Sequence, residues 1–169
     1  MKKQINKDPD HNDAQSKPVV LSAQVDFIRE WLPQIQVARA SRPGQHQSQR
    51  KIQAALDLWI RSVVASGFKS IVCLLSGQEL ALYSHLDGGL LGQYERNGIE
   101  SVSIPIPIDR SPVLTGGDRA EILDAFLKLP KPIVIHCSAG IVRSGAAVRF
   151  LEARSLAARG SAEAGEARP

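Results

Sequence analysis

A cysteine and an arginine lie six residues apart in the segment HCSAGIVRSG, which spans residues 136–145. The segment follows a short apolar run, PIVI, and precedes an alanine-rich run, GAAVRFLEA. This pattern predicts a strand, a tight loop and a helix. The start of such a helix directs backbone N–H groups and the positive end of its dipole at the loop. The spacing therefore favours a site that binds an oxyanion beside a thiolate.

The residue types in this loop suit nucleophilic chemistry. A thiol near a helix N-terminus and a cation has a lowered pKa, which makes Cys137 the candidate nucleophile. Arg143 can offer two parallel N–H donors to an oxyanion, which lysine cannot. Gly140 permits a tight turn with positive φ. The Ser144 hydroxyl can hydrogen-bond the sulfur, and His136 is expected to brace the loop. A buried core thiol is the alternative for the cysteine, but a core thiol needs neither the arginine nor the glycines.

The elements that would position this loop alternate along the chain. Apolar residues spaced by three and four indicate helices, and short apolar runs between glycines or prolines indicate buried strands. The predicted helices cover residues 49–66, 78–97 (in two pieces), 118–129 (capped by Asp118) and 145–153, and the predicted strands cover 69–75, 99–104 and 132–136. The alternation predicts an α/β fold with a central, mostly parallel sheet and helices on both sides.

The 169 residues suit one domain with a real core. Residues 1–18 are polar and are expected to form a flexible tail, with a first short strand at 19–21 opening the folded domain. That domain is expected to span residues 19–157, and residues 158–169, which include no large apolar side chain, are expected to form a frayed end. The polar first 18 residues do not resemble a secretory signal, and no apolar run is long enough to span a membrane, so we expect a cytoplasmic protein.

Charge and composition limit the partners. The net charge is +4, and the stretch from Arg39 to Lys51 is basic without neighbouring acids, which favours an anionic partner or simply a solvated loop. Nucleic acid is disfavoured because only 5% of residues are aromatic and the basic residues form no long stripe. His11, His46 and His85 have no partners at metal-ligand spacing, so no metal is expected.

The HCSAGIVRSG loop resembles the signature loop of the protein-tyrosine phosphatase superfamily, specifically its small dual-specificity type. The resemblance covers residues 19–156, because SRPG, GFKSIVCLL and ERNGIESVSIPIPID precede the loop in the expected order. It implies a phosphorylated protein or peptide as substrate, no metal or cofactor, and a phosphocysteine on Cys137 that water then hydrolyses. The phosphate would be bound by Arg143 and by the backbone of Ser138, Ala139, Gly140, Ile141 and Val142.

This chemistry also needs an acid that protonates the leaving oxygen and then activates water. In such phosphatases an aspartate on a loop after a strand does both. Asp109 ends the segment IPIPID, 28 residues before the cysteine, and is the leading candidate. Asp118 is the alternative, although it suits a helix cap better. Asp124 lies inside the predicted helix and fits least.

Several assignments stay open. The variable loop positions are uncharged, so a phosphoinositide or another small phosphate ester is a weaker alternative substrate than a phosphoprotein. A rhodanese-like sulfurtransferase and an inactive phosphate-binding module are more remote alternatives. Cys73 is expected to be a packed strand thiol, although some relatives pair such a cysteine with the oxidised nucleophile. Glu79 and Tyr83 could approach the site, but their expected place is a helix surface.

Overall fold

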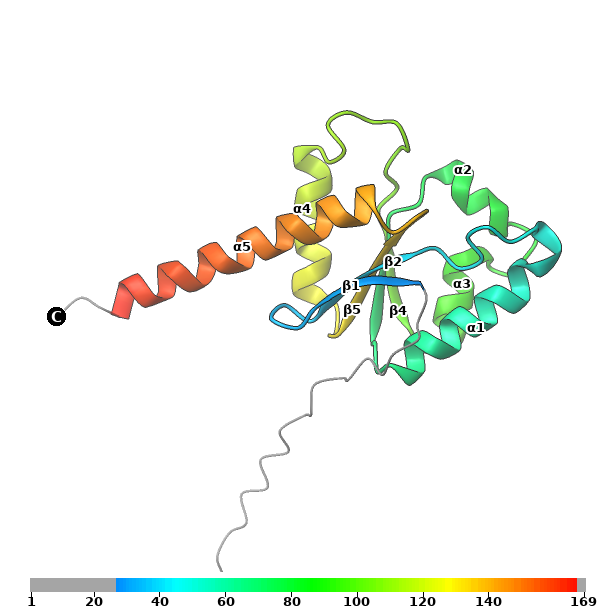
Figure 1. Ribbon diagram of the computed structural model, residues 1–169, viewed down its shortest axis with the longest axis horizontal. Coiled ribbons are helices and arrows are strands. Elements are labelled where there is room, and N and C mark those ends of the chain that lie inside the picture. Colours follow the sequence, from blue (N-terminus) through cyan, green and yellow to red (C-terminus); the bar gives the residue numbers. More distant parts are fainter. Residues whose placement is uncertain (1–26, 167–169) are drawn as a thin grey trace, which may run out of the picture.

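A single mixed sheet forms the centre of the computed structural model, which describes residues 27–166 (Figure 1). Its strands stand in the order β1-β2-β5-β3-β4. The first strand pairs antiparallel with the second, and the remaining pairs are parallel. The strands are β1 (Ile28–Leu32), β2 (Val37–Ser41), β3 (Ser70–Cys73), β4 (Glu100–Ser103) and β5 (Ile133–Cys137).

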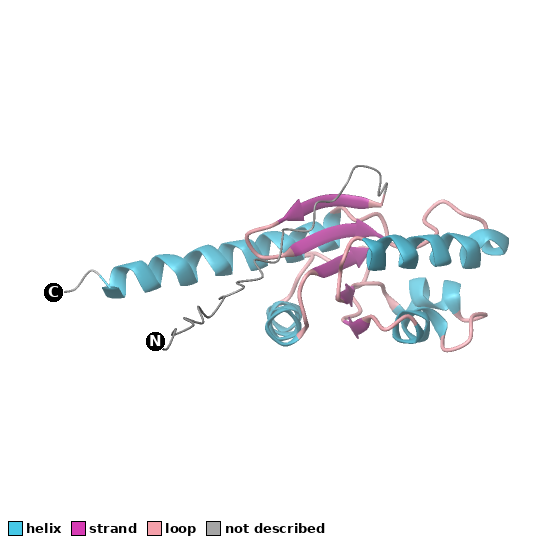
Figure 2. Cartoon of the chain, turned by 90° about the horizontal axis from the view of Figure 1, so that it is seen from below, coloured by secondary structure: helices cyan, strands magenta, loops and turns pink. Residues whose placement is uncertain are grey.

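Helices cover both faces of the sheet, as Figure 2 shows, so the predicted α/β class is confirmed. One apolar cluster packs α1 and α3 against one face, and a second packs α4 and α5 against the other. Strand residues alternate between the two clusters because successive side chains point to opposite faces. The helices are α1 (Ile52–Ala65), α2 (Gly77–Leu80), α3 (Gly89–Arg96), α4 (Gly116–Lys128) and α5 (Val142–Glu166), with 3-10 turns η1 (Gln49–Lys51) and η2 (Ala81–Tyr83).

The register of the parallel strands brings their carboxyl ends to one edge of the sheet. Ser41 at the end of β2 is opposite Cys137 at the end of β5, and Cys73 at the end of β3 is opposite His136. The segments that follow these three strands therefore start within one or two strand spacings of each other. This edge is where a ligand is expected in an open parallel sheet.

Two features differ from the sequence-based expectation. The β1–β2 hairpin was not predicted, because its residues lack the long apolar run that marked the other strands. The last helix continues to Glu166, past Ala157, where a frayed end was expected. The expected strand at residues 19–21 lies outside the described residues.

The cap of α4 also differs from the prediction. Thr115 is the N-cap, and its side chain accepts a hydrogen bond from the Asp118 N–H. Asp118 is the third residue of the helix, and its carboxylate accepts a hydrogen bond from the backbone N–H of Thr115 at 2.6 Å. The two residues form a reciprocal capping box, so the assignment of Asp118 as the cap itself was wrong.

No described helix is long and apolar enough to cross a membrane.

Candidate active site

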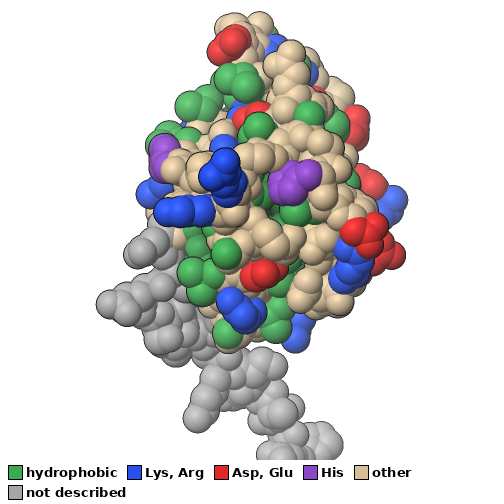
Figure 3. Space-filling model, turned by 90° about the vertical axis from the view of Figure 1, so that its right-hand side faces the viewer, with side chains coloured by type: hydrophobic (Ala, Val, Ile, Leu, Met, Phe, Trp, Pro, Cys, Tyr) green, Lys and Arg blue, Asp and Glu red, His purple; other side chains and the backbone are tan. Residues whose placement is uncertain are grey.

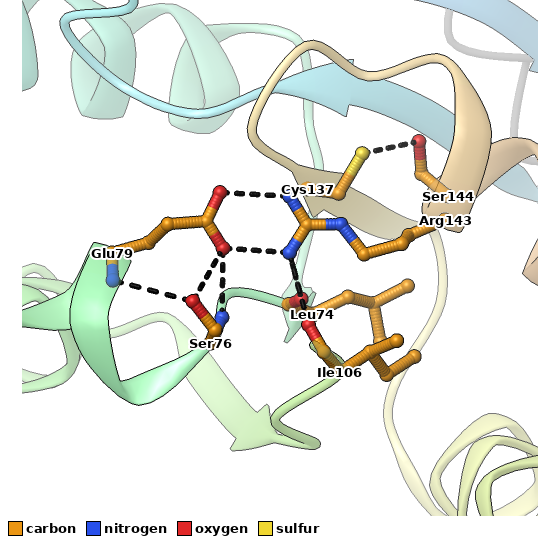
Figure 4. Close-up of polar contacts among 7 residues, drawn as sticks. All are labelled: Leu74, Ser76, Glu79, Ile106, Cys137, Arg143 and Ser144. Carbon is orange, nitrogen blue, oxygen red and sulfur yellow. Dashed lines mark hydrogen bonds and ion pairs between the residues drawn. The ribbon is translucent and has the colours of Figure 1, made fainter. Parts of the chain in front are cut away.

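The HCSAGIVRSG segment forms a tight loop between β5 and α5, as predicted (Figure 4). Cys137 ends the strand, and its Sγ lies 3.3 Å from the Ser144 Oγ in the first turn of the helix. Gly140 has φ +72, and a Cβ there would lie 2.4 Å from the carbonyl carbon of Ala40. Glycine is required at this position for both conformation and space, because β2 passes directly against the loop.

The backbone of the loop supplies a row of N–H donors. In the described part of the chain, the N–H groups of residues 139–143 donate to no protein acceptor. The loop is held instead by bonds from the β2 side, where the Arg42 N–H donates to the Ser138 carbonyl at 3.0 Å and the Arg39 Nη1 donates to the Gly140 carbonyl at 2.9 Å. Converging N–H groups at a helix start form a nest for an oxyanion.

Arg143 is fixed by a buried ion pair with Glu79 (Figure 4). Its Nη1 lies 2.6 Å from Oε2 and its Nη2 lies 2.7 Å from Oε1, so the pairing is bidentate. The Nη1 also donates to the carbonyls of Leu74 and Ile106, each at 3.1 Å. Both charged side chains are buried, which makes the pair costly to separate.

This pairing changes the predicted use of the arginine. Arginine has five N–H donors, and Glu79 takes the pair at the end of the guanidinium. The Nε–H and the second Nη2–H, which lie along the side of the plane, have no partner among the described residues. These two are parallel donors and can bind two oxygens of one phosphate. The edge of the guanidinium that carries Nε–H and one Nη2–H is therefore available to an anion, while the edge between Nη1 and Nη2 is paired with Glu79.

Glu79 and Tyr83 were expected on a helix surface, and both are buried. Glu79 forms a capping box with Ser76 at the start of α2, which already fixes its carboxylate. Burial alone would raise the pKa of Glu79, but hydrogen bonds from Arg143 and Ser76 outweigh burial and lower it to about 2. The spacing Ser-x-x-Glu directly after the β3 segment is the sequence signal that could have identified this residue.

His136 was expected to brace the loop, and that role stays a prediction, since its ring contacts Tyr94 and Trp59. It is fully buried, and its Nε2 lies 3.0 Å from the Tyr94 hydroxyl. Burial lowers its pKa to about 3. The imidazole is therefore neutral near pH 7, and it packs edge-on against Trp59 and Tyr94.

Cys73 lies on the opposite face of the sheet from the loop cysteine. It is aligned with His136 in the parallel register, so it shares that residue's face, and Cys137 points to the other. Burial raises the pKa of Cys73 to about 12. The core thiol that the sequence favoured is the arrangement observed.

The three candidate acids lie in different settings. Asp109 is exposed in a turn of the loop between β4 and α4, three residues after Ile106, whose carbonyl binds Arg143. In the described structure it makes no hydrogen bond or ion pair, and its role stays a prediction. Asp118 is engaged by Thr115 and Arg110, which lower its pKa despite partial burial. Asp124 pairs with Lys128 on the exposed face of α4.

Comparison with known proteins gives structural matches only. No protein-family model and no curated protein sequence matches the chain. A crystal structure of kinase associated phosphatase, with its catalytic-site cysteine replaced by serine, matches at 20% identity and a TM-score of 0.48, over 64% of this chain and 59% of that one. P. aeruginosa TpbA, with a cysteine-to-serine substitution and in complex with phosphotyrosine, matches at 17% identity and a TM-score of 0.35, over 73% and 66%.

The chain is similar to both structures at 20% identity or less. It spans less than two thirds of the length of either one. The function has to be inferred from the residues of the site.

The Glu79–Arg143 pair predicts a pH-dependent loss of stability. Replacing Glu79 by Gln leaves a buried, unpaired guanidinium and should cost about 3–5 kcal/mol at pH 7. Because the folded pKa of Glu79, about 2, lies below its ordinary 4.5, its contribution is complete above pH 4.5 and is lost as pH falls toward 2. Urea unfolding of both proteins at pH 7, 4 and 3 measures this. Glu95→Gln, at an exposed position of α3, is the matched control. A difference between Glu79→Gln and wild type that is independent of pH would contradict the pairing.

The sheet geometry predicts that the two cysteines do not form a disulfide. Their side chains point to opposite faces, and the buried Cys73 thiol is not ionised near neutral pH. After brief treatment with peroxide, mass spectrometry without reductant should find no Cys73–Cys137 bond. The Cys73→Ala variant should lose and regain activity with dithiothreitol as the wild type does. Detection of the disulfide as the main product would overturn the assignment of Cys73 as a core residue.

Proposed function

We propose that this chain is a cysteine-dependent phosphatase that hydrolyses phosphotyrosine, and also phosphoserine and phosphothreonine, on proteins. The observation that carries the proposal is the arrangement of the loop. Cys137 lies at the base of the loop, and the N–H groups of residues 139–143 have no acceptor among the described residues. Glu79 holds Arg143, whose Nε–H and second Nη2–H likewise have no partner among these residues. The resemblance of the signature loop supports the same reading.

The proposed reaction has two displacements at phosphorus. The Cys137 thiolate attacks phosphorus and forms an S–P bond as the ester P–O bond breaks, and Asp109 gives its proton to the leaving oxygen. Asp109 then takes a proton from water, which attacks phosphorus and breaks the S–P bond. The Ser144 hydroxyl, 3.3 Å from the sulfur, donates a hydrogen bond to the departing thiolate. Arg143 and the loop N–H groups stabilise the equatorial oxygens in both steps.

The nature of the substrate is part of the proposal. Ile141 and Val142 are exposed on the loop, which carries no cation at its variable positions. This favours an aryl or alkyl phosphate on a protein over a highly charged inositol lipid. A sulfurtransferase of the rhodanese type requires no acid in the position of Asp109, and formation of thiocyanate from thiosulfate distinguishes it from hydrolysis of an aryl phosphate.

Replacing the nucleophile tests the proposal directly. Cys137→Ser should lose essentially all turnover of an aryl phosphate but still bind tungstate, because the N–H groups and Arg143 remain. Steady-state kinetics and calorimetric titration with tungstate measure the two properties. Cys73→Ala, which removes the other thiol, is the matched control and should stay active. Activity of Cys137→Ser within tenfold of wild type would refute the assignment.

The role of Asp109 predicts a dependence on the leaving group. A positioned acid increases the reaction rate ~10²–10⁴-fold where the leaving oxygen needs a proton. Asp109→Asn should therefore slow phosphoenzyme formation strongly on a phosphotyrosine peptide and much less on a difluorinated coumarin phosphate, as measured by burst kinetics. Asp118→Asn is the control, since its carboxylate is engaged by Thr115 and Arg110 and should affect stability instead. The opposite result for the two variants would assign the acid to Asp118.

A further inference from the structure

A pocket lies beside the signature loop, on the side of β2. Its volume is about 280 Å³, and it is open to solvent. Its lining combines basic and polar side chains with the aromatic side chains of Phe27 and Trp59. The residues that carry the argument are Phe27, Arg29, Arg42, His46 and Trp59.

Residues that line the pocket also contact the signature loop. The Arg42 N–H donates to the Ser138 carbonyl at 3.0 Å, and the Arg29 Nε donates to the Ala139 carbonyl at 3.4 Å. Ser41, which also lines the pocket, stands opposite Cys137 in the sheet. Neighbouring strands are about 4.8 Å apart. The pocket therefore adjoins the carbonyl side of the signature loop, one strand spacing from the strand that ends in Cys137.

Arg42 is held in place without being neutralised. Its Nη1 donates to the Tyr83 hydroxyl at 3.0 Å, and that buried hydroxyl donates to the Pro43 carbonyl at 2.6 Å. Trp59 fixes the same turn by donating to the Ser41 carbonyl. The Nε of Arg42 is buried and makes no hydrogen bond to the described residues. The buried Nε is not accessible to a ligand, but the second Nη1–H and both Nη2–H groups have no acceptor among the described residues, and no described acid pairs with the guanidinium.

A neighbouring arginine shows the contrast. Arg39 donates to Glu30 at 2.6 Å and to the Gly140 carbonyl, so its charge is paired and its role is to hold the loop. The expectation that Arg39 has no acid nearby was wrong. Among the described residues Arg42 has no such partner, and none of those that line the pocket is acidic. The pocket is therefore an electropositive site next to the loop.

The face of the molecule in Figure 3 carries a group of Lys and Arg side chains with histidines close to them. Arg50 and Lys51 in η1 are exposed and follow the pocket residue Gln47 closely in sequence. These charges extend the positive potential around the pocket and would attract an anionic segment.

We propose that this pocket binds a second anionic group of the phosphopeptide substrate, with Arg42 as the residue that determines this specificity. The inference rests on the proposed phosphatase function. The group is a carboxylate or a second phosphate on a residue next to the phosphotyrosine. Its charge is matched by the guanidinium of Arg42 and by Arg29, and the half-buried side chain of Phe27 can contact the peptide chain.

Three phosphotyrosine peptides test the inference, with glutamine, glutamate or phosphoserine on both sides of the phosphotyrosine. One charge-assisted hydrogen bond corresponds to at least about tenfold in kcat/KM. The wild type should therefore prefer the glutamate or phosphoserine peptide over the glutamine peptide by about tenfold, mainly through KM. Of the glutamate and phosphoserine peptides, the one with the larger kcat/KM relative to the glutamine peptide identifies the preferred anion. In Arg42→Gln the ratio should fall close to one, and Arg42→Lys should restore part of it.

The ratio of two substrates on one enzyme sample is unaffected by partial unfolding of a variant. Arg61→Gln is the matched control, because Arg61 is exposed on α1, does not line the pocket and removes the same charge. It should keep the wild-type ratio. A wild-type ratio near one, an unchanged ratio in Arg42→Gln, or a preference for phosphoinositide vesicles over all three peptides overturns the inference. Failure of the wild type on every aryl phosphate would instead refute the proposed phosphatase function.

Discussion

The buried ion pair between Arg143 and Glu79 connects the parts of the molecule that make up the site. Arg143 comes from the start of α5 and Glu79 from the start of α2, and the same guanidinium binds the carbonyls of Leu74 and Ile106. Four chain segments are therefore tied to one planar group. Burying two charges has a large desolvation cost, which the bidentate geometry and the added hydrogen bonds offset. The pair also leaves one edge of the guanidinium free, so the contacts that fix the arginine also orient its remaining donors.

A second constraint is the close approach of β2 to the signature loop. The loop can pass the strand only because Gly140 has no side chain, and two arginine contacts from the β2 side then hold its carbonyls. Carbonyls bound from outside leave the N–H groups of the loop turned toward the other side. The strand pairing thus has a direct effect on the site, since it determines which polar groups of the loop are available to an anion.

The arginines around the loop have different roles because their partners differ. Arg143 is paired with a buried carboxylate, Arg39 with an exposed one, and Arg42 with a neutral hydroxyl. A paired arginine contributes geometry with little net charge, whereas one bonded to a neutral group keeps its charge for a ligand. This distinction separates a residue that shapes the loop from one suited to recognise a substrate.

The sequence by itself determined the strand–loop–helix unit, the positive φ at Gly140, the α/β class and the core position of Cys73. These depend on local spacing, because hydrophobic periodicity and the short-range chemistry of one loop are written in consecutive residues. The role of Asp109 stays a prediction from the sequence, because its exposed carboxylate makes no hydrogen bond or ion pair with the described residues. Only the tertiary structure decided that Glu79 pairs with Arg143 and that β1 and β2 form a hairpin at the sheet edge. It also decided that, among the described residues, Arg39 has an acidic partner and Arg42 has none. These contacts join residues separated by many positions, and their partners depend on strand order and register, which a single sequence does not specify.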